Sequence, residues 1–321
     1  MNNAVEVTEL SKEFEINTEY ENLLKRLFNK KKEKVCAVNE VSFMIPQGEM
    51  VALLGKNGAG KSTLIKILTG IINPSKGEVM VAGYIPYKQR YKYSYHIGVV
   101  MGQKSLLWHN IPVKESLNLY KTIYGVSDKD YEKRIDFFRG LFDIDRLFEV
   151  PVRKLSLGER MKFEIVAALI NEPEVLFLDE PTIGLDLLAK KQLYSFLREI
   201  NAIKNTTIIL TTHNVEDVEN LCERVILMDK GKIIFDGKIV ELCKRTELKT
   251  IVITGDVKLD DDMRIYLESQ EGNRFVFKCN KDDTELVANI MSRVVSGSDI
   301  SIIGTELEDI LLQVYKGEVI I

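Results

Sequence analysis

The 321-residue sequence has few cysteines, few histidines and no long apolar run. Its four cysteines (Cys36, Cys222, Cys243 and Cys279) are far apart and form no CxxC pair, and only three histidines are available to join them as metal ligands. No uncharged apolar stretch reaches the ~18 residues that a membrane-spanning helix needs. We therefore expect reduced, mostly buried thiols, no zinc framework and no membrane span.

Neither sign of charge dominates, because 44 Lys and Arg stand against 48 Asp and Glu, for a net charge of -4. This excludes a global positive field that would hold the whole protein on nucleic acid or anionic lipid. The first ten residues contain Glu6 and Glu9 and lack the basic and apolar regions of a secretory signal. We expect a globular, cytoplasmic protein, and the length predicts about two domains.

Short apolar segments alternate with segments of helical periodicity from about Val51 to Ile234, which predicts a parallel α/β domain. The pattern is mostly helical from Val113 to Ile170, which predicts a helical insert over about 104–170. After about residue 240 the pattern changes, so we expect a first domain over 1–240 and a small α+β domain over 241–321. The expected strands are Met50–Leu54, Ile97–Met101, Val175–Leu178, Thr207–Leu210, Ile251–Thr254 and Arg274–Lys278, and the expected C-terminal helices are Thr284–Val294 and one opened by Thr305.

A glycine-rich segment, Gly55–Ser62, fits the pattern G-x-x-x-x-G-K-[ST] between an expected strand and an expected helix. Its backbone N–H groups and the helix N-terminus would surround phosphates, Lys61 would reach the β- and γ-phosphates, and Ser62 would bind Mg²⁺. A turn without a ligand is the alternative, which the strand and helix context disfavours. The candidate nucleotide contacts are Gly55, Asn57, Gly58, Ala59, Gly60, Lys61, Ser62 and Thr63.

Two carboxylates, Asp179 and Glu180, end the apolar strand that begins at Val175. The carboxyl ends of parallel strands share one edge of a sheet, so these acids should lie beside the glycine-rich segment. Asp179 would hold Mg²⁺, and Glu180 would orient and deprotonate an attacking water. A solvated strand end is the alternative reading.

Further segments resemble the ATP-binding cassette ATPases over residues 4–240. Leu155–Glu159 resembles the signature LSGGQ of that family, Pro181–Asp186 its D-loop, His213 its switch histidine and Gln103 its Q-loop glutamine. The resemblance implies a P-loop NTPase cassette with a RecA-like parallel sheet core, an antiparallel β subdomain and a helical insert.

The resemblance also implies a function and a set of roles. Two cassettes would form a head-to-tail dimer in which ATP lies between Gly55–Ser62 of one copy and Ser156–Gly158 of the other. The residues that would act on ATP are Glu180, His213, Gln103 and Lys61; those that would hold Mg²⁺ are Ser62, Gln103 and Asp179; and those that would bind the nucleotide besides the glycine-rich segment are Phe14, Ser156, Gly158, Glu159 and Asp186.

The sequence departs from the family pattern at several places. The signature segment reads LSLGE, with Leu157 and Glu159 in place of glycine and glutamine, which predicts tighter packing at Leu157 and a negative charge near phosphate. Phe14 is either the aromatic that stacks on adenine or an ordinary core aromatic. An extension over residues 15–37 combines an amphipathic pattern with the basic run Lys25–Lys34, which is typical of a helix on an anionic membrane or of a solvated surface helix.

We interpret the chain as the ATPase subunit of an exporter. It would act at the cytoplasmic face of the membrane, with permease subunits on separate chains and a second copy or a homologous cassette as its partner, and without nucleic acid. The alternative is a soluble cassette ATPase that acts on nucleic acid or ribosomes, for which Tyr84–Tyr95 offers interleaved tyrosines and basic residues. We expect that stretch to be a surface hairpin instead. A kinase would not explain the signature segment or His213.

Overall fold

A computed structural model describes residues 2–17, 32–102, 104–245, 248–255, 257, 259, 261–280, 292, 299–304, 307–308 and 310–311. Residues 18–31, which hold most of the predicted amphipathic extension, and Gln103 lie outside this part. The chain divides into two compact units, Met1–Asp236 and Gly237–Ile321. None of the helices in the described part of the chain combines the length and apolar character that a membrane crossing requires.

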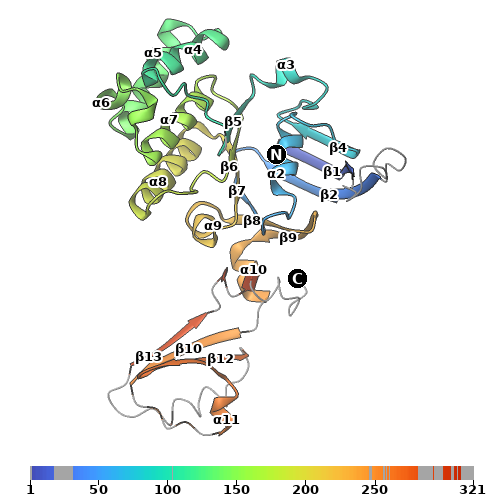
Figure 1. The fold of residues 1–321 in the computed structure, drawn as a ribbon, viewed down its shortest axis with the longest axis vertical. Helices are drawn as coiled ribbons and strands as arrows, with labels where there is room; N and C mark the ends of the chain where they lie inside the picture. Colours follow the sequence, from blue (N-terminus) through green and yellow to red (C-terminus); the bar gives the residue numbers. More distant parts are fainter. Residues whose placement is uncertain are drawn as a thin grey trace, which may run out of the picture. The chain divides into compact units, whose positions relative to one another are not determined.

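The first unit is built on a sheet with the strands β3 (Met50–Leu54), β5 (Ile97–Met101), β6 (Val175–Asp179), β7 (Thr207–Thr212), β8 (Arg224–Asp229) and β9 (Lys232–Lys238). Their order is β5-β6-β7-β3-β8-β9, and the neighbours from β5 to β8 run parallel (Figure 1). Every residue of β3 and β7 is buried, as expected for parallel strands covered on both faces. The strands predicted for this unit are therefore confirmed.

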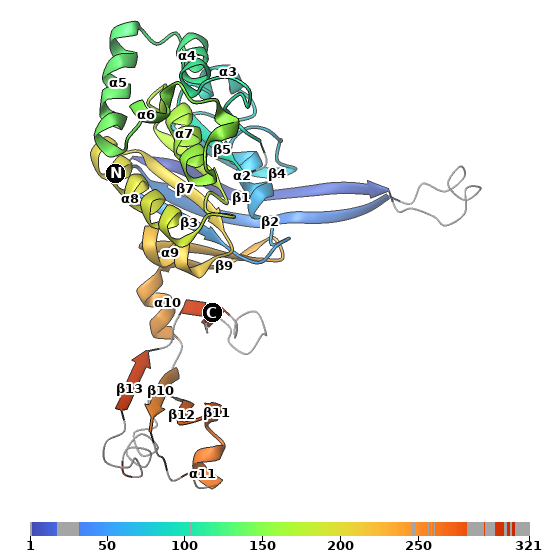
Figure 2. The same cartoon turned by 60° about the vertical axis from the view of Figure 1, so that its left-hand side comes forward.

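An antiparallel sheet lies beside this core and consists of β1 (Asn3–Asn17), β2 (Lys32–Pro46) and β4 (Lys76–Val81). β1 and β2 run side by side as long strands, whereas β4 pairs with β1 only between Val5 and Ser11 (Figure 2). The ends of the predicted extension, residues 15–17 and 32–37, are therefore strand. Apolar side chains of this sheet and of the central sheet pack into one core, as Val5, Ile45 and Val51 do.

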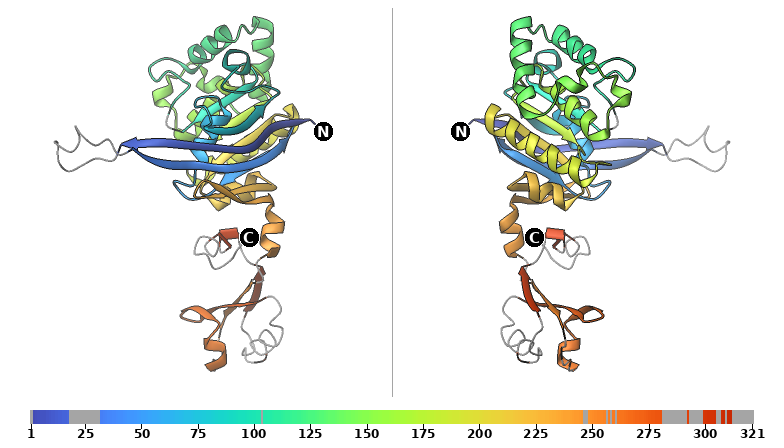
Figure 3. Two further views of the ribbon diagram at one scale, coloured as in Figure 1. Left: turned by 90° about the vertical axis from the view of Figure 1, so that its right-hand side faces the viewer. Right: turned by 90° about the vertical axis from the view of Figure 1, so that its left-hand side faces the viewer.

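Helices cover the central sheet, and α4 to α8 gather on the side away from the antiparallel sheet (Figure 1 and Figure 3). The predicted mostly helical stretch from Val113 to Ile170 is found as α4 to α7. The helices of this unit are α2 (Lys61–Leu68), α3 (Arg90–Tyr93), α4 (Val113–Ile123), α5 (Asp128–Leu141), α6 (Asp145–Phe148), the 3-10 helix η1 (Val152–Lys154), α7 (Leu157–Leu169), α8 (Leu187–Lys204) and α9 (Val215–Leu221).

The stretch Tyr84–Tyr95 is not the predicted surface hairpin, because it contains the short helix α3. Tyr93 is buried and its hydroxyl donates a hydrogen bond to the Leu68 carbonyl at 2.5 Å. Tyr84 and Tyr87 also pack against the core. The tyrosines that face inward anchor a turn and a helix in place of a hairpin.

The second unit is α+β, with the helices α10 (Ile239–Arg245) and α11 (Asp261–Arg264) and the strands β10 (Leu248–Thr254), β11 (Leu267–Glu271), β12 (Arg274–Asn280) and β13 (Asp299–Gly304). The strands form an antiparallel sheet in the order β11-β12-β10-β13, around a core of Ile251, Ile253, Met263, Phe275 and Phe277. The predicted strands are confirmed. β11 was not predicted, since four of its five residues are exposed. Of the predicted helix Thr284–Val294 only Ser292 is described, and it is helical. Thr305 lies outside the described residues, but Leu307, Glu308, Ile310 and Leu311, which belong to the helix predicted to follow it, are helical.

Candidate functional site

The segment Gly55–Ser62 connects the buried strand β3 to helix α2. Gly58 and Gly60 have φ angles of 84° and 106°, which favour glycine. A Cβ at Gly60 would also lie 2.4 Å from the Ala37 carbonyl oxygen, so a larger residue has no room there. Gly60 precedes α2 without a side-chain cap, which leaves backbone N–H groups directed at this end of the helix for an anion. Asn57 is exposed, Ala59 is buried and Thr63 is half-buried.

Lys61 begins α2 and is buried, with 5% of its surface exposed. Its ammonium donates hydrogen bonds to the carbonyl oxygens of Gly55 at 2.5 Å and of Lys56 at 3.1 Å. Burial lowers the pKa of Lys61 below its ordinary value, although the charges of Glu180 and Asp179 act in the opposite direction. A cation therefore sits inside the glycine-rich loop, within the field of the two acids.

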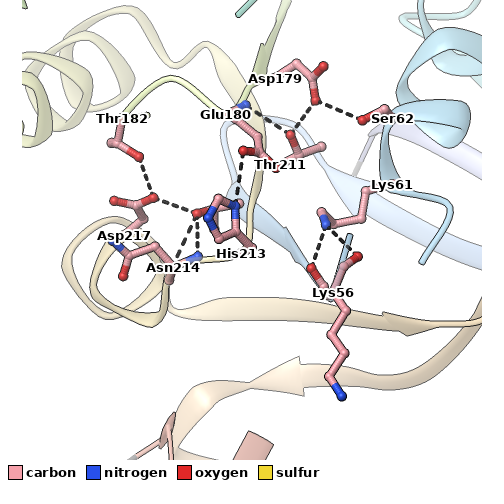
Figure 4. A network of polar contacts seen from close by, with 12 residues as sticks. Lys56, Lys61, Ser62, Asp179, Glu180, Thr182, Thr211, His213, Asn214 and Asp217 are labelled. Carbon is pink, nitrogen blue, oxygen red and sulfur yellow. Dashed lines mark hydrogen bonds and ion pairs between the residues drawn. The ribbon is translucent and has the colours of Figure 1, made fainter. Parts of the chain in front are cut away.

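Asp179, at the end of β6, lies beside the first residues of α2 (Figure 4). Its Oδ1 accepts a hydrogen bond from the Thr211 hydroxyl at 2.6 Å and is 3.4 Å from the Ser62 hydroxyl. In the part of the chain that the structure describes, no three His, Cys, Asp or Glu side chains gather as metal ligands. Mg²⁺ is usually held by one or two carboxylates together with substrate phosphates, so the hard oxygen atoms of Ser62 and Asp179 fit this ion.

Glu180 follows directly and has a left-handed backbone, with φ 53°. Its N–H group donates to both the carbonyl and the hydroxyl oxygen of Thr211, each at 3.1 Å. The Glu180 carboxylate Oε2 is 3.1 Å from His213 Nδ1 (Figure 4). The fold thus brings together Lys61, Ser62, Asp179, Glu180 and His213 from three segments of the chain.

Thr211 was not predicted as a site residue, although its hydroxyl contacts both acids. The sequence contains one signal for it, since the strand β7 ends in two threonines directly before His213. Gln103, which was predicted to act on ATP and to hold Mg²⁺, lies outside the described residues. Phe14 lies on β1 and is 38% exposed, with the Lys12 ammonium 5.2 Å from its ring centroid, so the alternative of a core aromatic is wrong.

The signature segment Leu155–Glu159 opens helix α7. The Ser156 hydroxyl accepts a hydrogen bond from the Glu159 N–H, and the Glu159 carboxylate accepts one from the Ser156 N–H, which together form a capping box. Arg146 donates to the other carboxylate oxygen at 2.8 Å. Burial raises the pKa of Glu159, but the hydrogen bonds from Ser156 and Arg146 outweigh it and hold that pKa below its ordinary value.

The packing predicted for Leu157 is wrong, because this side chain is 45% exposed. Leu157 is the first residue of α7 and lies next to Gly184, where an added Cβ would be 3.1 Å from Leu157 Cδ2. Gly158 does have a packing role, since a Cβ there would come within 2.8 Å of the Ala189 Cβ. The glycine lets α7 begin close to α8.

The signature segment and the acid cluster, by which we mean Asp179 and Glu180 with His213, face different hollows. Ser156, Gly158, Glu159 and Asp186 line one of about 590 Å³. Asp186 also caps α8 by accepting a hydrogen bond from the Ala189 N–H at 2.8 Å. A second hollow, of about 220 Å³, is lined by Glu180, His213 and neighbouring residues. Within one chain, therefore, the predicted nucleotide contacts fall into two groups.

Comparison with known proteins gives the same fold and a family. The family model for the ABC transporter matches residues 38–183. The ABC transporter ATP-binding protein NatA of Bacillus subtilis is 33% identical over 217 residues, which are 68% of this chain and 88% of that protein. The linearmycin resistance ATP-binding protein LnrL of the same organism is 31% identical, over 71% of this chain and 72% of that protein.

Other similarities extend the comparison. The methionine import ATP-binding protein MetN 2 of Enterococcus faecalis is 30% identical over 70% of this chain and 66% of that protein. A solved ATP-binding subunit of an ABC transporter superposes with a TM-score of 0.61 at 28% identity, covering 75% of this chain and 92% of the other. The fold, the phosphate loop between β3 and α2 and these similarities agree: the chain belongs to the ATP-binding proteins of ABC transporters, which bind and hydrolyse ATP.

Proposed function

We propose that this ATPase powers an exporter and works as a head-to-tail dimer. The observation that carries the proposal is that two groups of predicted nucleotide contacts line different hollows of one chain: Glu180 and His213 line one, and Ser156, Gly158 and Glu159 line the other. A second copy, turned head to tail, would bring its Ser156 and the N-terminus of its α7 to the phosphates of ATP bound at the first copy's Gly55–Ser62. Such N–H donors bind phosphate strongly. ATP would then close the dimer, and hydrolysis would release it.

The chemistry follows from the positions of the side chains. The Lys61 ammonium would leave its carbonyl partners for the β- and γ-phosphate oxygens, where it meets full negative charges. The Glu180 carboxylate would accept a proton from the attacking water, and His213, 3.1 Å from it, would hold the carboxylate and contact the γ-phosphate. Gln103 remains a predicted contact for the same phosphate and for the permease.

The hydroxyl of Ser62 and the carboxylate of Asp179 would hold Mg²⁺, as their oxygen chemistry supports. When bound, Mg²⁺ neutralises charge on the phosphate oxygens. Thr211 would keep the Asp179 carboxylate turned towards Ser62 by its 2.6 Å hydrogen bond. Phe14 remains the proposed stacking partner of adenine, and its exposure supports that role.

The export direction rests on likeness, since the linearmycin resistance protein LnrL is among the relatives and the segment Pro181–Asp186 resembles that of exporters. Permease subunits on separate chains would hold the protein at the cytoplasmic face of the membrane. The first unit would act as the cassette, and the second unit would stabilise the dimer or regulate it.

Glu180→Gln tests the catalytic part of the proposal. It should keep ATP affinity, slow hydrolysis by roughly 10²–10⁴-fold and accumulate a dimer with Mg-ATP, as measured by light scattering. The matched control is Glu174→Gln, because Glu174 also pairs with a histidine, His96 Nδ1 at 2.8 Å, but at the opposite end of β6. Near-normal turnover in Glu180→Gln would contradict the role of Glu180 as the base. If the Glu180→Gln protein stayed monomeric with Mg-ATP, the proposed dimer would be contradicted.

The transport part of the proposal is tested by recovering tagged Glu180→Gln protein from native membranes with Mg-ATP. Multi-spanning membrane proteins in stoichiometric amounts are the expected result, and their identity would show which substrates to assay for export. Recovery of nucleic acid or ribosomes without a membrane protein would leave the ATPase standing and contradict the exporter.

A further inference from the structure

A buried carboxylate lies behind the acid cluster and takes no part in the chemistry proposed above. Asp217, on α9, has no exposed surface. Its Oδ2 accepts hydrogen bonds from the hydroxyls of Thr182 and Thr212, and its Oδ1 accepts one from the hydroxyl of Tyr194, each at 2.6 Å. Burial and the hydrogen bond to Asp217 raise the pKa of Tyr194 well above its ordinary value, so Tyr194 is a neutral donor.

Two of the three hydroxyl donors to Asp217 come from the segments that hold the Glu180–His213 pair. Thr182, whose hydroxyl bonds to Asp217 in Figure 4, lies two residues after Glu180. Thr212 lies one residue before His213. The third donor, Tyr194, comes from α8 and is adjacent to neither of them in the chain. Asp217 therefore joins the ends of β6 and β7 from behind, just beyond the positions where the catalytic side chains emerge.

Glu180 needs such support because its backbone is left-handed, a conformation that residues with a side chain rarely adopt. On its N-terminal side, the hydrogen bonds of its N–H to Thr211 hold it. On its C-terminal side, the Ile183 N–H donates to the Glu180 carbonyl at 3.3 Å, and Thr182 is bound to Asp217. Without the bond to Asp217, the turn after Glu180 would keep only backbone hydrogen bonds, from the Ile183 N–H to the Glu180 carbonyl at 3.3 Å and from the Leu185 N–H to the Thr182 carbonyl at 3.1 Å.

We propose that Asp217 is a positioning residue, which acts through the Thr182 hydroxyl to keep the Glu180 carboxylate directed at His213 and at the phosphate loop. The inference rests on the proposed role of Glu180 and adds a second layer of residues behind it. The proposal also gives Thr182, which lies in the segment that resembles the D-loop, a function within its own chain. Asp217 and Thr182 need not touch ATP, since they act on the backbone that carries the base.

Two single-hydroxyl deletions separate positioning from simple stabilisation. Thr182→Val and Tyr194→Phe each remove one 2.6 Å hydrogen bond to the same buried carboxylate. Both should lower the melting temperature. Only Thr182→Val should lower kcat, by about tenfold or more, with the KM for ATP unchanged, because displacing a catalytic group by about 1 Å costs up to ~100-fold. Thr182→Ser, which keeps the hydroxyl, should recover kcat.

A second measurement tests whether Thr182 acts through Glu180. Adding Thr182→Val to Glu180→Gln should not reduce kcat further, because the carboxylate that Thr182 positions is already gone. If Thr182→Val does not fold, Thr182→Ala takes its place with the same expected results. Each protein is first checked by circular dichroism and by its melting temperature.

Equal kcat losses in Thr182→Val and Tyr194→Phe, or full kcat in Thr182→Val, would overturn the inference. A further loss of kcat in the double variant would also overturn it. These outcomes are separate from a failure of the proposed function: an active Glu180→Gln protein would remove the base itself, whereas an inactive Glu180→Gln with a normal Thr182→Val would remove only the role of Asp217.

Discussion

The two halves of the candidate site are built in different ways. The phosphate side, with Lys61, Asp179, Glu180 and His213, is assembled at the edge of a buried parallel sheet from segments far apart in the sequence. The signature side consists of helix N-termini, whose caps bond to residues three positions later, as Ser156 does to Glu159. The first half depends on the tertiary fold, whereas the second is local and surface-exposed.

This difference has a functional meaning. The phosphate side holds a cation, a proposed base and oxygen ligands for Mg²⁺, so one chain should bind ATP without help. The signature side contributes the Ser156 hydroxyl and the N-terminus of α7 but neither the cation nor the proposed base, and it faces a separate hollow. Changes on the phosphate side should therefore alter ATP binding and chemistry at any protein concentration, whereas changes on the signature side should alter only the dimer.

The largest expected effect is that of Lys61→Ala, which removes the buried cation. ATP affinity should fall about 100-fold, or roughly 3 kcal/mol, because charge-assisted hydrogen bonds to phosphate are lost. The measurement is calorimetric titration with Mg-ATP at protein concentrations too low for dimers. Lys66→Ala is the control, since Lys66 is an exposed lysine of the same helix. Unchanged ATP affinity in Lys61→Ala would contradict the view that the phosphate side alone binds ATP.

Ser156→Ala should have an intermediate effect. Loss of the cap of α7 costs about 1 kcal/mol of stability. The ATP-dependent dimer of the Glu180→Gln protein should weaken about tenfold or more, because a hydrogen bond to phosphate disappears. ATP affinity of the dilute protein should stay the same. Sedimentation measures the dimer, and titration measures the affinity.

The control for Ser156→Ala is Ser127→Ala. Ser127 caps α5 in the same way, by accepting a hydrogen bond from the Asp130 N–H at 3.1 Å, but does not line the signature hollow. Ser127→Ala should lower the free energy of unfolding by a similar amount and leave the ATP-dependent dimer intact. Equal dimer loss in both variants would mean that capping, and not phosphate binding, accounts for the effect of Ser156.

The smallest expected effect concerns the charge of Glu159. Glu159→Gln keeps a side chain that completes the capping box but loses the ion pair with Arg146, so the free energy of unfolding should fall by about 0.5 kcal/mol at neutral pH. The pKa of Glu159 is lower in the folded protein than the ordinary value of 4.5. Its charge therefore stabilises the fold above pH 4.5, and this contribution is lost as the pH falls through the folded-state pKa.

Urea unfolding of the original and Glu159→Gln proteins at about pH 7 and about pH 3 measures this contribution. The difference between the two proteins should shrink at the lower pH and in high salt. A difference that grows as the pH falls would show that the carboxylate is destabilising, and would assign the effect to repulsion rather than to Arg146.

The sequence predicted the parts of the site that are local. Gly55–Ser62 and the Asp179–Glu180 pair were found because a strand, a turn and a helix follow one another in the pattern, and the strands around them are confirmed. Asp217 and its donors were missed. The hydrogen bond from Thr182 joins residues 35 positions apart, and no periodicity in the sequence pairs them. The parallel register of β6 and β7, together with the packing of α8 and α9, brings them together.

The errors have a similar origin. Leu157 replaces a glycine, which suggested packing, but its position at the start of α7 directs the side chain outwards. In Tyr84–Tyr95, which tyrosines face the core depends on α2 and on the antiparallel sheet, as the hydrogen bond of Tyr93 to Leu68 illustrates. Side-chain orientation at such places is set by neighbours that are distant in the sequence.

The glycine-rich segment Gly55–Ser62 is connected by a hydrogen bond to a residue far along the chain, Gly231, and this limits how the protein can be shortened. The Gly231 N–H donates to the Ala59 carbonyl at 2.9 Å, and the Asn39 N–H donates to the Gly231 carbonyl at 2.8 Å. The nucleotide loop is therefore braced by β2 and by the turn between β8 and β9. A shortened protein that stops at residue 183, where the family match ends, would contain the whole loop motif and β2 but lack Gly231, which links the two. We therefore expect a fragment that binds ATP to include Gly231.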